Sequence, residues 1–194
     1  MKYQRGLLAE VEGYTPGEQP KDTRVIKLNT NENPYPPSPR VLEALQALGP
    51  EAFRKYPDPV STRFRSLCAE QFGYPGPEWV VVGNGMDELL SLVLRTFVDP
   101  GDTVLAPYPT YTLYEILCKL HGCTLHSVDL DEQFQLTEAH FNTPARLCFL
   151  TRPNAPSGVA VPREVMAQFC ERFEGLVVID EAYVDFCDDD CMDF

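Results

Sequence analysis

The sequence predicts a three-layer αβα fold, in which helices cover both faces of a mostly parallel sheet. From residue 79 onward, continuous runs of β-branched and other apolar residues alternate with segments of helical length. The connections between these runs are short. Strand and helix in steady alternation indicate strand–helix–strand units, whose strands are parallel.

Five strands are expected from these apolar runs. They are WVVVG (79–83), TVLAP (103–107), TLHSVDL (124–130), ARLCFLT (145–151) and LVVID (176–180). The intervening helices are expected at 86–98, 110–120 and 162–173. Gly122 ends the second of these helices, and Pro162 begins the third.

The segment ahead of the sheet is less regular. Residues 39–48 and 62–72 are predicted as helices, with Gly73 ending the second. VIKL (25–28) is predicted as a short strand, and the rest of the first 37 residues is rich in Pro, Gly and Asn. Such a segment is expected to be an arm rather than a packed element.

Composition excludes several classes of protein. The 194 residues are enough for one ordinary domain, and their net charge of −13 disfavours nucleic acid and anionic membranes as partners. No apolar run is long enough to span a bilayer, and the N-terminal residues lack the apolar run of a secretory signal. The seven cysteines are odd in number and form no CxxC motif, so reduced thiols in a cytoplasmic protein are expected. Cys187 and Cys191 flank three aspartates without a nearby His, which favours a solvated loop over a metal site.

Ligands of such sheets bind beyond the carboxyl ends of the strands. After the first expected strand, Gly83-Asn84-Gly85 leads into a helix, whose N-terminus suits a phosphate, although such a glycine is as often only a turn. A dinucleotide fingerprint needs a third glycine where Glu88 stands, so that motif is not met.

Three further strand ends carry unusual residues. Tyr111 is either a core side chain or a ring that stacks on a planar ligand, and Asn154 is either a turn residue or an amide that reaches a ligand oxygen. Asp180 ends an apolar strand, where a buried carboxylate is costly without a partner. It is either solvated, a cap, or the partner of a cation or a protonated ring nitrogen. Tyr183 offers a phenol to a ring oxygen.

Together these groups match pyridoxal 5′-phosphate (PLP), which has a phosphate, a flat ring, a phenolic oxygen and a pyridine nitrogen. The sequence resembles the fold type I PLP-dependent aminotransferases, and within them the histidinol-phosphate aminotransferase subfamily. The motifs that carry the resemblance occur in the family's order: YTPG (14–17), LNTNENPYPPSP (28–39), RKYPD (54–58), GMDEL, PTY, PNAPSG and VIDEAYVDF. It covers nearly the whole chain.

The resemblance implies roles for several residues. The backbone of Met86 and Asp87 would bind the PLP phosphate. Tyr111 would stack on the pyridine ring, and Asp180 would pair with its nitrogen.

Further contacts follow from the same resemblance. Asn154 and Tyr183 would hydrogen-bond the 3′-oxygen of PLP. Tyr56 would reach the PLP phosphate of a neighbouring subunit, which implies a homodimer. Tyr14 and Asn33 would lie on the substrate side.

The sequence also departs from the family pattern. The family's Schiff-base lysine belongs to a Ser-Lys motif downstream of VIDEAYVDF, and the 194 residues contain no such motif, so no catalytic residue is assigned. Residues 1–37 are expected to be the N-terminal arm and 38–194 the N-terminal part of the PLP-binding large domain, incomplete at its C-terminus. Residues 38–50 are expected to pack with a small domain absent from the sequence. Arg152 has no counterpart in the family motif, and the sequence gives no reason for it.

The implied function is histidinol-phosphate transamination in histidine biosynthesis, with 2-oxoglutarate and glutamate as the acceptor and donor pair. Two other fold type I enzymes share these PLP contacts, a threonine-phosphate decarboxylase and an aromatic-amino-acid aminotransferase. A binding domain that has lost catalysis, and an unrelated nucleotide-binding α/β domain, are the alternatives from other classes. Without its lysine, the 194-residue chain alone is expected to be inactive.

Overall fold

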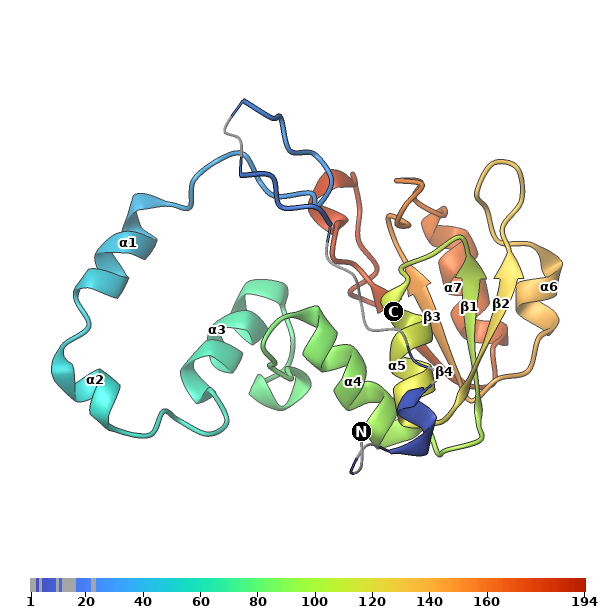
Figure 1. The fold of residues 1–194 in the computed structure, drawn as a ribbon, viewed down its shortest axis with the longest axis horizontal. Helices are drawn as coiled ribbons and strands as arrows, with labels where there is room; N and C mark the ends of the chain where they lie inside the picture. The colour runs from blue at the N-terminus through green and yellow to red at the C-terminus, as the bar shows by residue number, and fades with distance from the viewer. Residues whose placement is uncertain (1–2, 4, 10, 12–16, 22–23) are drawn as a thin grey trace. The chain divides into compact units, whose positions relative to one another are not determined.

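The computed structural model describes residues 3, 5–9, 11, 17–21 and 24–194. The chain divides into two compact units, of which the larger combines Met1–Tyr14 with Gly83–Phe194 and the smaller is Thr15–Val82. The larger unit contains a four-stranded sheet with the order β2-β1-β3-β4, in which every neighbouring pair is parallel (Figure 1). The predicted α/β fold with a parallel sheet is thereby confirmed.

The strands and helices of the larger unit alternate along the chain. In chain order they are η1 (Gly6–Ala9), α4 (Met86–Phe97), β1 (Thr103–Tyr108), α5 (Leu113–His121), β2 (Thr124–Asp129), α6 (Glu138–Asn142), β3 (Leu147–Thr151), α7 (Arg163–Arg172), β4 (Leu176–Asp180) and η3 (Val184–Phe186). Four of the five expected strands are present within a residue or two. Gly122, with a φ of 90°, ends α5 in the left-handed conformation that glycine adopts without strain.

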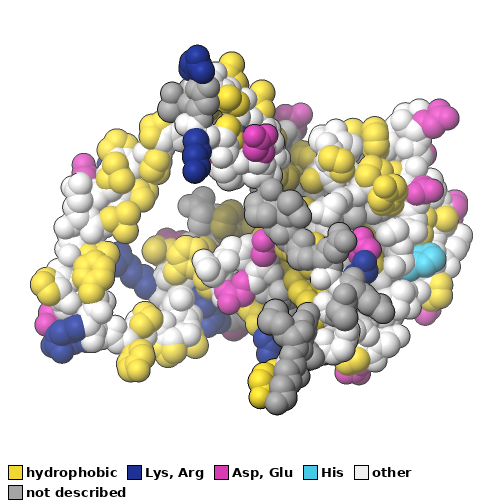
Figure 2. Space-filling model, in the orientation of Figure 1, with side chains coloured by type: hydrophobic (Ala, Val, Ile, Leu, Met, Phe, Trp, Pro, Cys, Tyr) yellow, Lys and Arg dark blue, Asp and Glu magenta, His cyan; other side chains and the backbone are white. Residues whose placement is uncertain are grey.

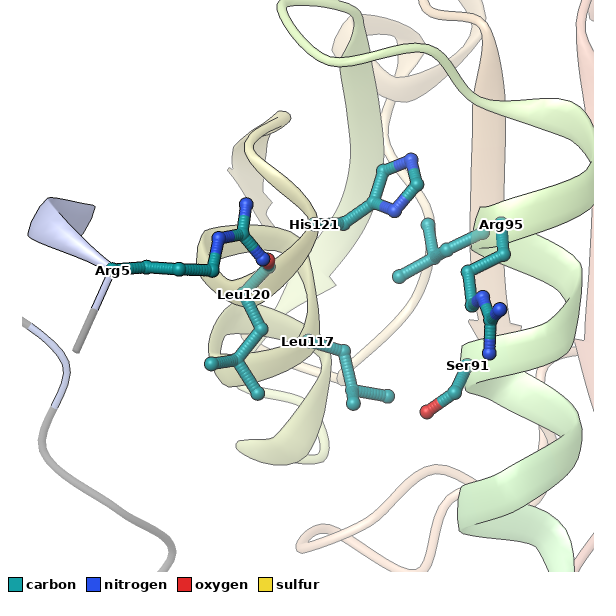
Figure 3. A pocket seen from close by; sticks show the side chains of 7 residues that line it. Arg5, Ser91, Arg95, Leu117, Leu120 and His121 are labelled. Atoms are coloured by element: carbon teal, nitrogen blue, oxygen red, sulfur yellow. The ribbon is translucent and has the colours of Figure 1, made fainter. Parts of the chain in front are cut away.

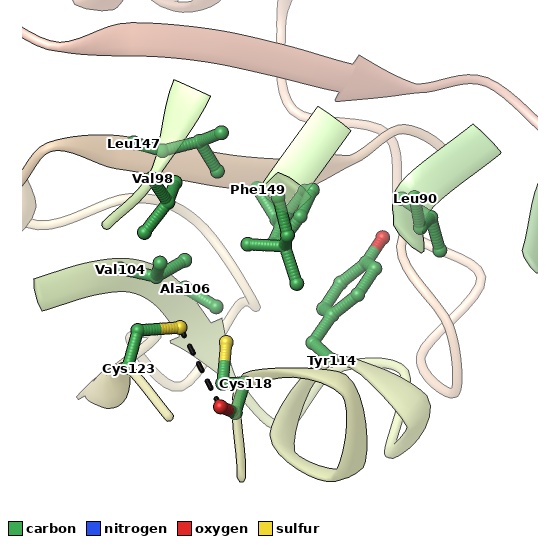
Figure 4. Packing of buried hydrophobic residues seen from close by; sticks show 10 residues of the cluster. Leu90, Val98, Val104, Ala106, Tyr114, Cys118, Cys123, Leu147 and Phe149 are labelled. Carbon is green, nitrogen blue, oxygen red and sulfur yellow. Dashed lines mark hydrogen bonds between the residues drawn. The ribbon is translucent and has the colours of Figure 1, made fainter. Parts of the chain in front are cut away.

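Alternate residues of the two central strands enter opposite cores. Val104, Ala106, Leu147 and Phe149 pack with α4 and α5 on one face of the sheet. Leu105, Cys148 and Leu150 pack with Met166 and Phe169 of α7 on the other face. The central strands are therefore buried on both sides, which explains their continuous apolar sequence. Figure 4 shows the first of these clusters.

The expected strand at 79–83 does not form. Pro77–Trp79 is a short 3-10 helix, η2, and although the backbone of Val80 is extended, no strand among the described residues pairs with this segment. Val81 is consequently 72% exposed. An apolar run supplies the extended conformation, but a strand also needs a neighbour to hydrogen-bond with. The short strand expected at 25–28 is also absent, and Ile26 and Leu28 are exposed.

The smaller unit is mostly helical. Its elements are α1 (Pro39–Gln46), α2 (Pro50–Arg54), α3 (Thr62–Phe72) and η2. The guanidinium of Arg65 ties α3 to η2, because it donates to the carbonyl oxygens of Pro77 (2.6 Å and 3.0 Å) and Val80 (2.7 Å). Among the described residues of this unit, Ala69 is the one that is buried. Hydrophobic side chains are exposed along α1 and α2 (Figure 2).

No helix in the described part of the chain is long and apolar enough to cross a membrane. All seven cysteines are free thiols. Burial raises the pKa of Cys148 and Cys118 well above the usual range of a thiol, so both stay protonated near neutral pH.

His140 is expected to make the stability of the larger unit depend on pH. Its buried ring caps α6: Nδ1 accepts from the backbone N–H of Thr137 (3.0 Å), and Nε2 donates to the carbonyl of Val128 (3.1 Å). Burial lowers the pKa of His140 below 6.5. Its contribution to stability is therefore present above pH 6.5 and is lost as the pH falls below it.

We expect the free energy of unfolding to decrease as the pH falls below 6.5, with a slope of up to about 1.4 kcal/mol per pH unit from this group. Urea unfolding at several pH values would measure this slope. His140→Gln should be less stable at pH 7 but should have a flatter profile, since Gln does not titrate. An equally steep profile in that variant would assign the pH dependence to other groups.

Candidate functional site

The carboxyl ends of the strands bring several predicted residues together. Asp180 is the last residue of β4, and its register partner Thr151 is the last residue of β3. Asp180 is 6% exposed and Asn154 is 4% exposed. These two polar side chains are buried at the edge of the sheet where parallel α/β folds bind ligands.

The carboxylate of Asp180 is held by two donors. The hydroxyl of Tyr114 donates to Oδ2 at 2.5 Å, and the backbone N–H of Ala182 donates to Oδ1 at 3.1 Å. A buried carboxylate held in this way keeps lone pairs for a hydrogen-bond donor of a ligand.

Tyr111 connects this carboxylate region to the start of α4. Its hydroxyl donates to Oδ1 of Asp87 at 3.3 Å, and its ring meets that of Tyr114 edge-on, with centroids 5.7 Å apart. Gly85, with a φ of 80°, precedes Met86, the first residue of α4, and no side chain of the described residues caps this helix. The first-turn N–H groups of a helix lack intrahelical partners, so the site includes donors suited to an anion. The carboxylate of Glu88 bonds the N–H of Asn84 beside them.

Asn154 has one amide atom engaged and one without a partner. Its Nδ2 donates to the carbonyl of Pro109 and to Oγ of Ser157, both at 3.0 Å. Its Oδ1 is buried and has no hydrogen-bond partner in the described part of the chain. A buried carbonyl oxygen without a hydrogen bond destabilises the folded protein. A hydrogen-bond donor of a ligand would therefore bind favourably to this atom.

The remaining predicted residues are Tyr183, Tyr56, Asn33 and Tyr14. Tyr183 follows Asp180 by three residues and is partly buried. Tyr56 and Asn33 belong to the smaller unit; Tyr56 is 100% exposed, and Oδ1 of Asn33 accepts from the N–H of Tyr35 at 2.9 Å. Tyr14 lies outside the described residues.

Two residues of this edge were missed by sequence reasoning. Tyr114 is buried on the inner side of α5, and Thr151 lies within 2.8 Å of its hydroxyl. The repeat of Tyr at 111 and 114 is the one sequence signal for Tyr114, because residues three apart at a helix start lie on the same side.

The structure also explains the presence of Arg152. Its buried guanidinium donates to the carbonyls of Val161 (2.8 Å) and Asp189 (3.1 Å) and forms an ion pair with the Asp189 carboxylate. Arg152 therefore fastens the acidic loop between Cys187 and Cys191 to the end of β3. No group of three or more metal-binding side chains is found among the described residues, and burial raises the pKa of Cys191 to about 11.

Asp189→Ala should destabilise the larger unit by about 1–2 kcal/mol, because the buried guanidinium of Arg152 loses its charged partner. The half-exposed carboxylate of Asp189 keeps the effect below that of a fully buried pair. Urea unfolding measures it, with Asp188→Ala, at an exposed neighbouring position, as the matched control. Equal midpoints for the two variants would contradict the assignment.

A cavity of about 440 Å³ lies elsewhere, between α4 and α5 (Figure 3). Leu94, Arg95, Leu117 and His121 are among its lining residues, together with Arg5. Most of these residues belong to the C-terminal halves of the two helices, and none of the described residues that are predicted to contact a ligand lines the cavity. The candidate site is therefore the edge of the sheet rather than this cavity.

Known proteins resemble this chain in sequence and in structure. Histidinol-phosphate aminotransferase of Crocosphaera subtropica is 44% identical over 98% of the chain, and that of Synechocystis sp. is 48% identical over 93%. These matches cover 54% and 51% of the two relatives, so the chain spans about half the length of the curated relatives it matches. The structure of histidinol-phosphate aminotransferase from Sinorhizobium meliloti in complex with PLP matches with a TM-score of 0.73 and 27% identity, over 80% of this chain and 44% of that one.

A second solved structure supports the fold alone. Aspartate aminotransferase of Thermus thermophilus matches with a TM-score of 0.79 at 22% identity, over 94% of this chain and 52% of that one. The family model for aminotransferases of class I and II matches residues 23–194. This match extends over most of the chain and agrees with the motifs and the parallel sheet. The chain belongs to the class I and II aminotransferase family.

Proposed function

We propose that the carboxyl edge of the sheet binds PLP. The observation that carries this proposal is the pair of buried polar groups at that edge, the hydrogen-bonded carboxylate of Asp180 and the unpaired Oδ1 of Asn154. PLP has complementary groups, since its pyridinium nitrogen requires an anionic partner and its phenolic oxygen can hydrogen-bond an amide. The residues present therefore fit the cofactor.

Each residue would have a separate task. Asp180 would accept a hydrogen bond from the protonated ring nitrogen, and Tyr111 would stack on the ring. Asn154 and Tyr183 would hydrogen-bond the 3′-oxygen, and the N–H groups of Met86 and Asp87 would bind the phosphate. When bound, PLP supplies an aldehyde and an electron-withdrawing ring for amino-group chemistry.

We further propose that two copies of the protein form a homodimer. The side chain of Tyr56 is fully exposed, as expected for a residue that contacts the phosphate in a neighbouring subunit. Tyr14 and Asn33 are proposed for the substrate side. The seven free thiols support a cytoplasmic location, where cysteines stay reduced. The domain division into an arm of residues 1–37 and the first part of a large domain at 38–194 remains a prediction.

The proposed reaction is amino transfer between histidinol phosphate and 2-oxoglutarate, as a step of histidine biosynthesis. It is supported by curated relatives that carry this name at 40–48% identity. The chain spans about half the length of the relatives it matches, and its 194 residues contain no Ser-Lys motif. The reaction is therefore proposed for the whole protein as its gene encodes it, not for these 194 residues alone.

The experiment is a direct comparison of substrates with the protein as its gene encodes it, saturated with PLP. Glutamate formation from histidinol phosphate and 2-oxoglutarate should exceed that from phenylalanine or tyrosine by at least about tenfold in kcat/KM, a difference of 1.4 kcal/mol. Release of carbon dioxide from threonine phosphate would instead indicate the decarboxylase. PLP binding without turnover of any substrate would indicate the inactive binding domain.

A further inference from the structure

Tyr114 links the apolar core to the proposed ring-nitrogen partner. Its ring is fully buried and stacks on that of Phe149, with centroids 4.6 Å apart and planes 13° apart. Figure 4 shows the ring within the cluster, its hydroxyl pointing away from Cys118 and Cys123. The ring contacts with Phe149 and Tyr111 fix the position of the hydroxyl, because buried rings in a dense core occupy a single rotamer.

The hydroxyl of Tyr114 contacts two polar groups. It donates to Oδ2 of Asp180 at 2.5 Å, and the hydroxyl of Thr151 lies 2.8 Å away. Burial, together with the charge of Asp180, raises the pKa of Tyr114 well above the usual range of a phenol. The phenol is therefore a permanent donor to Asp180, which leaves Thr151 to donate to Tyr114.

Both oxygens of the Asp180 carboxylate are thus oriented. Oδ1 accepts from the N–H of Ala182, and Oδ2 accepts from Tyr114. A carboxylate has about four lone-pair sites, so each oxygen keeps one for a further donor. Without the phenol, the bond from Ala182 would be the one remaining hydrogen bond, among the described residues, that resists rotation of the carboxylate about its Cβ–Cγ bond.

We infer that Tyr114 is a positioning residue, whose hydroxyl sets the direction in which Asp180 presents its carboxylate to the ring nitrogen of a bound pyridine. This inference rests on the proposed function and adds to it a residue that neither the motifs nor the sequence pattern assigned. Thr151 supports the arrangement by fixing the phenol in turn. The two residues act through Asp180 and not on the cofactor itself.

The experiment uses the protein as its gene encodes it, freed of cofactor, and two probes. Pyridoxine 5′-phosphate contains the ring nitrogen, and its 1-deaza analogue has carbon at that position; both are alcohols that form no covalent bond to a lysine. Unmodified protein should bind the nitrogen-containing probe more tightly. Tyr114→Phe should weaken that binding by about tenfold or more and leave binding of the deaza probe nearly unchanged.

A purely structural role would give a different result. If Tyr114→Phe weakens the binding of both probes equally, the hydroxyl acts on the site as a whole and the inference is overturned. In an Asp180→Asn background, Tyr114→Phe should have no further effect on the preference between probes. A persistent effect in that background would also contradict action through Asp180.

Two outcomes separate this inference from the proposed function. Unmodified protein that binds neither probe, or both equally, would refute the ring-nitrogen contact and the inference with it. A clear preference that Tyr114→Phe leaves intact would refute the inference alone. If Tyr114→Phe does not fold, Thr151→Val takes its place, and a smaller loss confined to the nitrogen-containing probe is expected.

Discussion

Asp180→Asn is expected to lower kcat/KM for amino transfer by about 10²–10³-fold in the protein as its gene encodes it. The amide keeps the size of the side chain but lacks the negative charge that stabilises a protonated pyridine nitrogen. Steady-state kinetics with histidinol phosphate and 2-oxoglutarate would measure the loss. The affinity for pyridoxine 5′-phosphate should fall together with the rate, since the same contact serves both.

The matched control is Asp185→Asn in η3, an exposed carboxylate five residues further along the chain. It should change the rate less than about twofold, because surface positions away from the site contribute little. Unfolding midpoints should show that both variants are folded. An Asp180→Asn protein that keeps half its activity would eliminate Asp180 as the ring-nitrogen partner.

The sequence predicted the elements whose signal is local. The central residues of β1 and β3 are buried on both faces of the sheet, which requires an apolar run in the sequence. The helix α3 begins and ends at the expected residues, 62 and 72. The run at 79–83 carries the same composition but forms no strand in the structure. The composition of a segment shows whether it can be buried, whereas strand formation also requires a neighbouring strand to pair with. The residues of the segment itself do not determine whether such a neighbour is present.

The residues of the candidate site likewise include some that the sequence could predict and some that it could not. Asp180 could be predicted because a carboxylate that ends an apolar strand is costly, and the structure shows it buried. Tyr114 could not be assigned, because a tyrosine within a helix is most often part of the core. Here it is both, with its ring in the core and its hydroxyl on Asp180. Likewise Arg152 acquires its role from Asp189, 37 residues away.

Phe149→Ala is expected to be the most destabilising substitution in the sheet, at about 3–5 kcal/mol. Phe149 is fully buried in the centre of β3, where its ring contacts that of Tyr114. Truncation removes the buried apolar surface and leaves a cavity that the surrounding strands close only in part. Since domains are stable by only about 5–15 kcal/mol, a considerable fraction of the protein would unfold in mild denaturant.

Urea unfolding should show a lower midpoint with an unchanged slope, which identifies a loss of stability rather than a change in the denatured state. Phe186→Ala is the matched control, because that phenyl group is 84% exposed and its removal should alter stability by less than about 0.5 kcal/mol. Because Tyr114 loses its stacking partner, Phe149→Ala should also weaken the preference for pyridoxine 5′-phosphate over its 1-deaza analogue. Phe149→Leu fills most of the volume, and it should recover both stability and preference in part. If stability fell while the preference stayed intact, Tyr114 would hold Asp180 without help from the core, and the stack on Phe149 would contribute to folding alone.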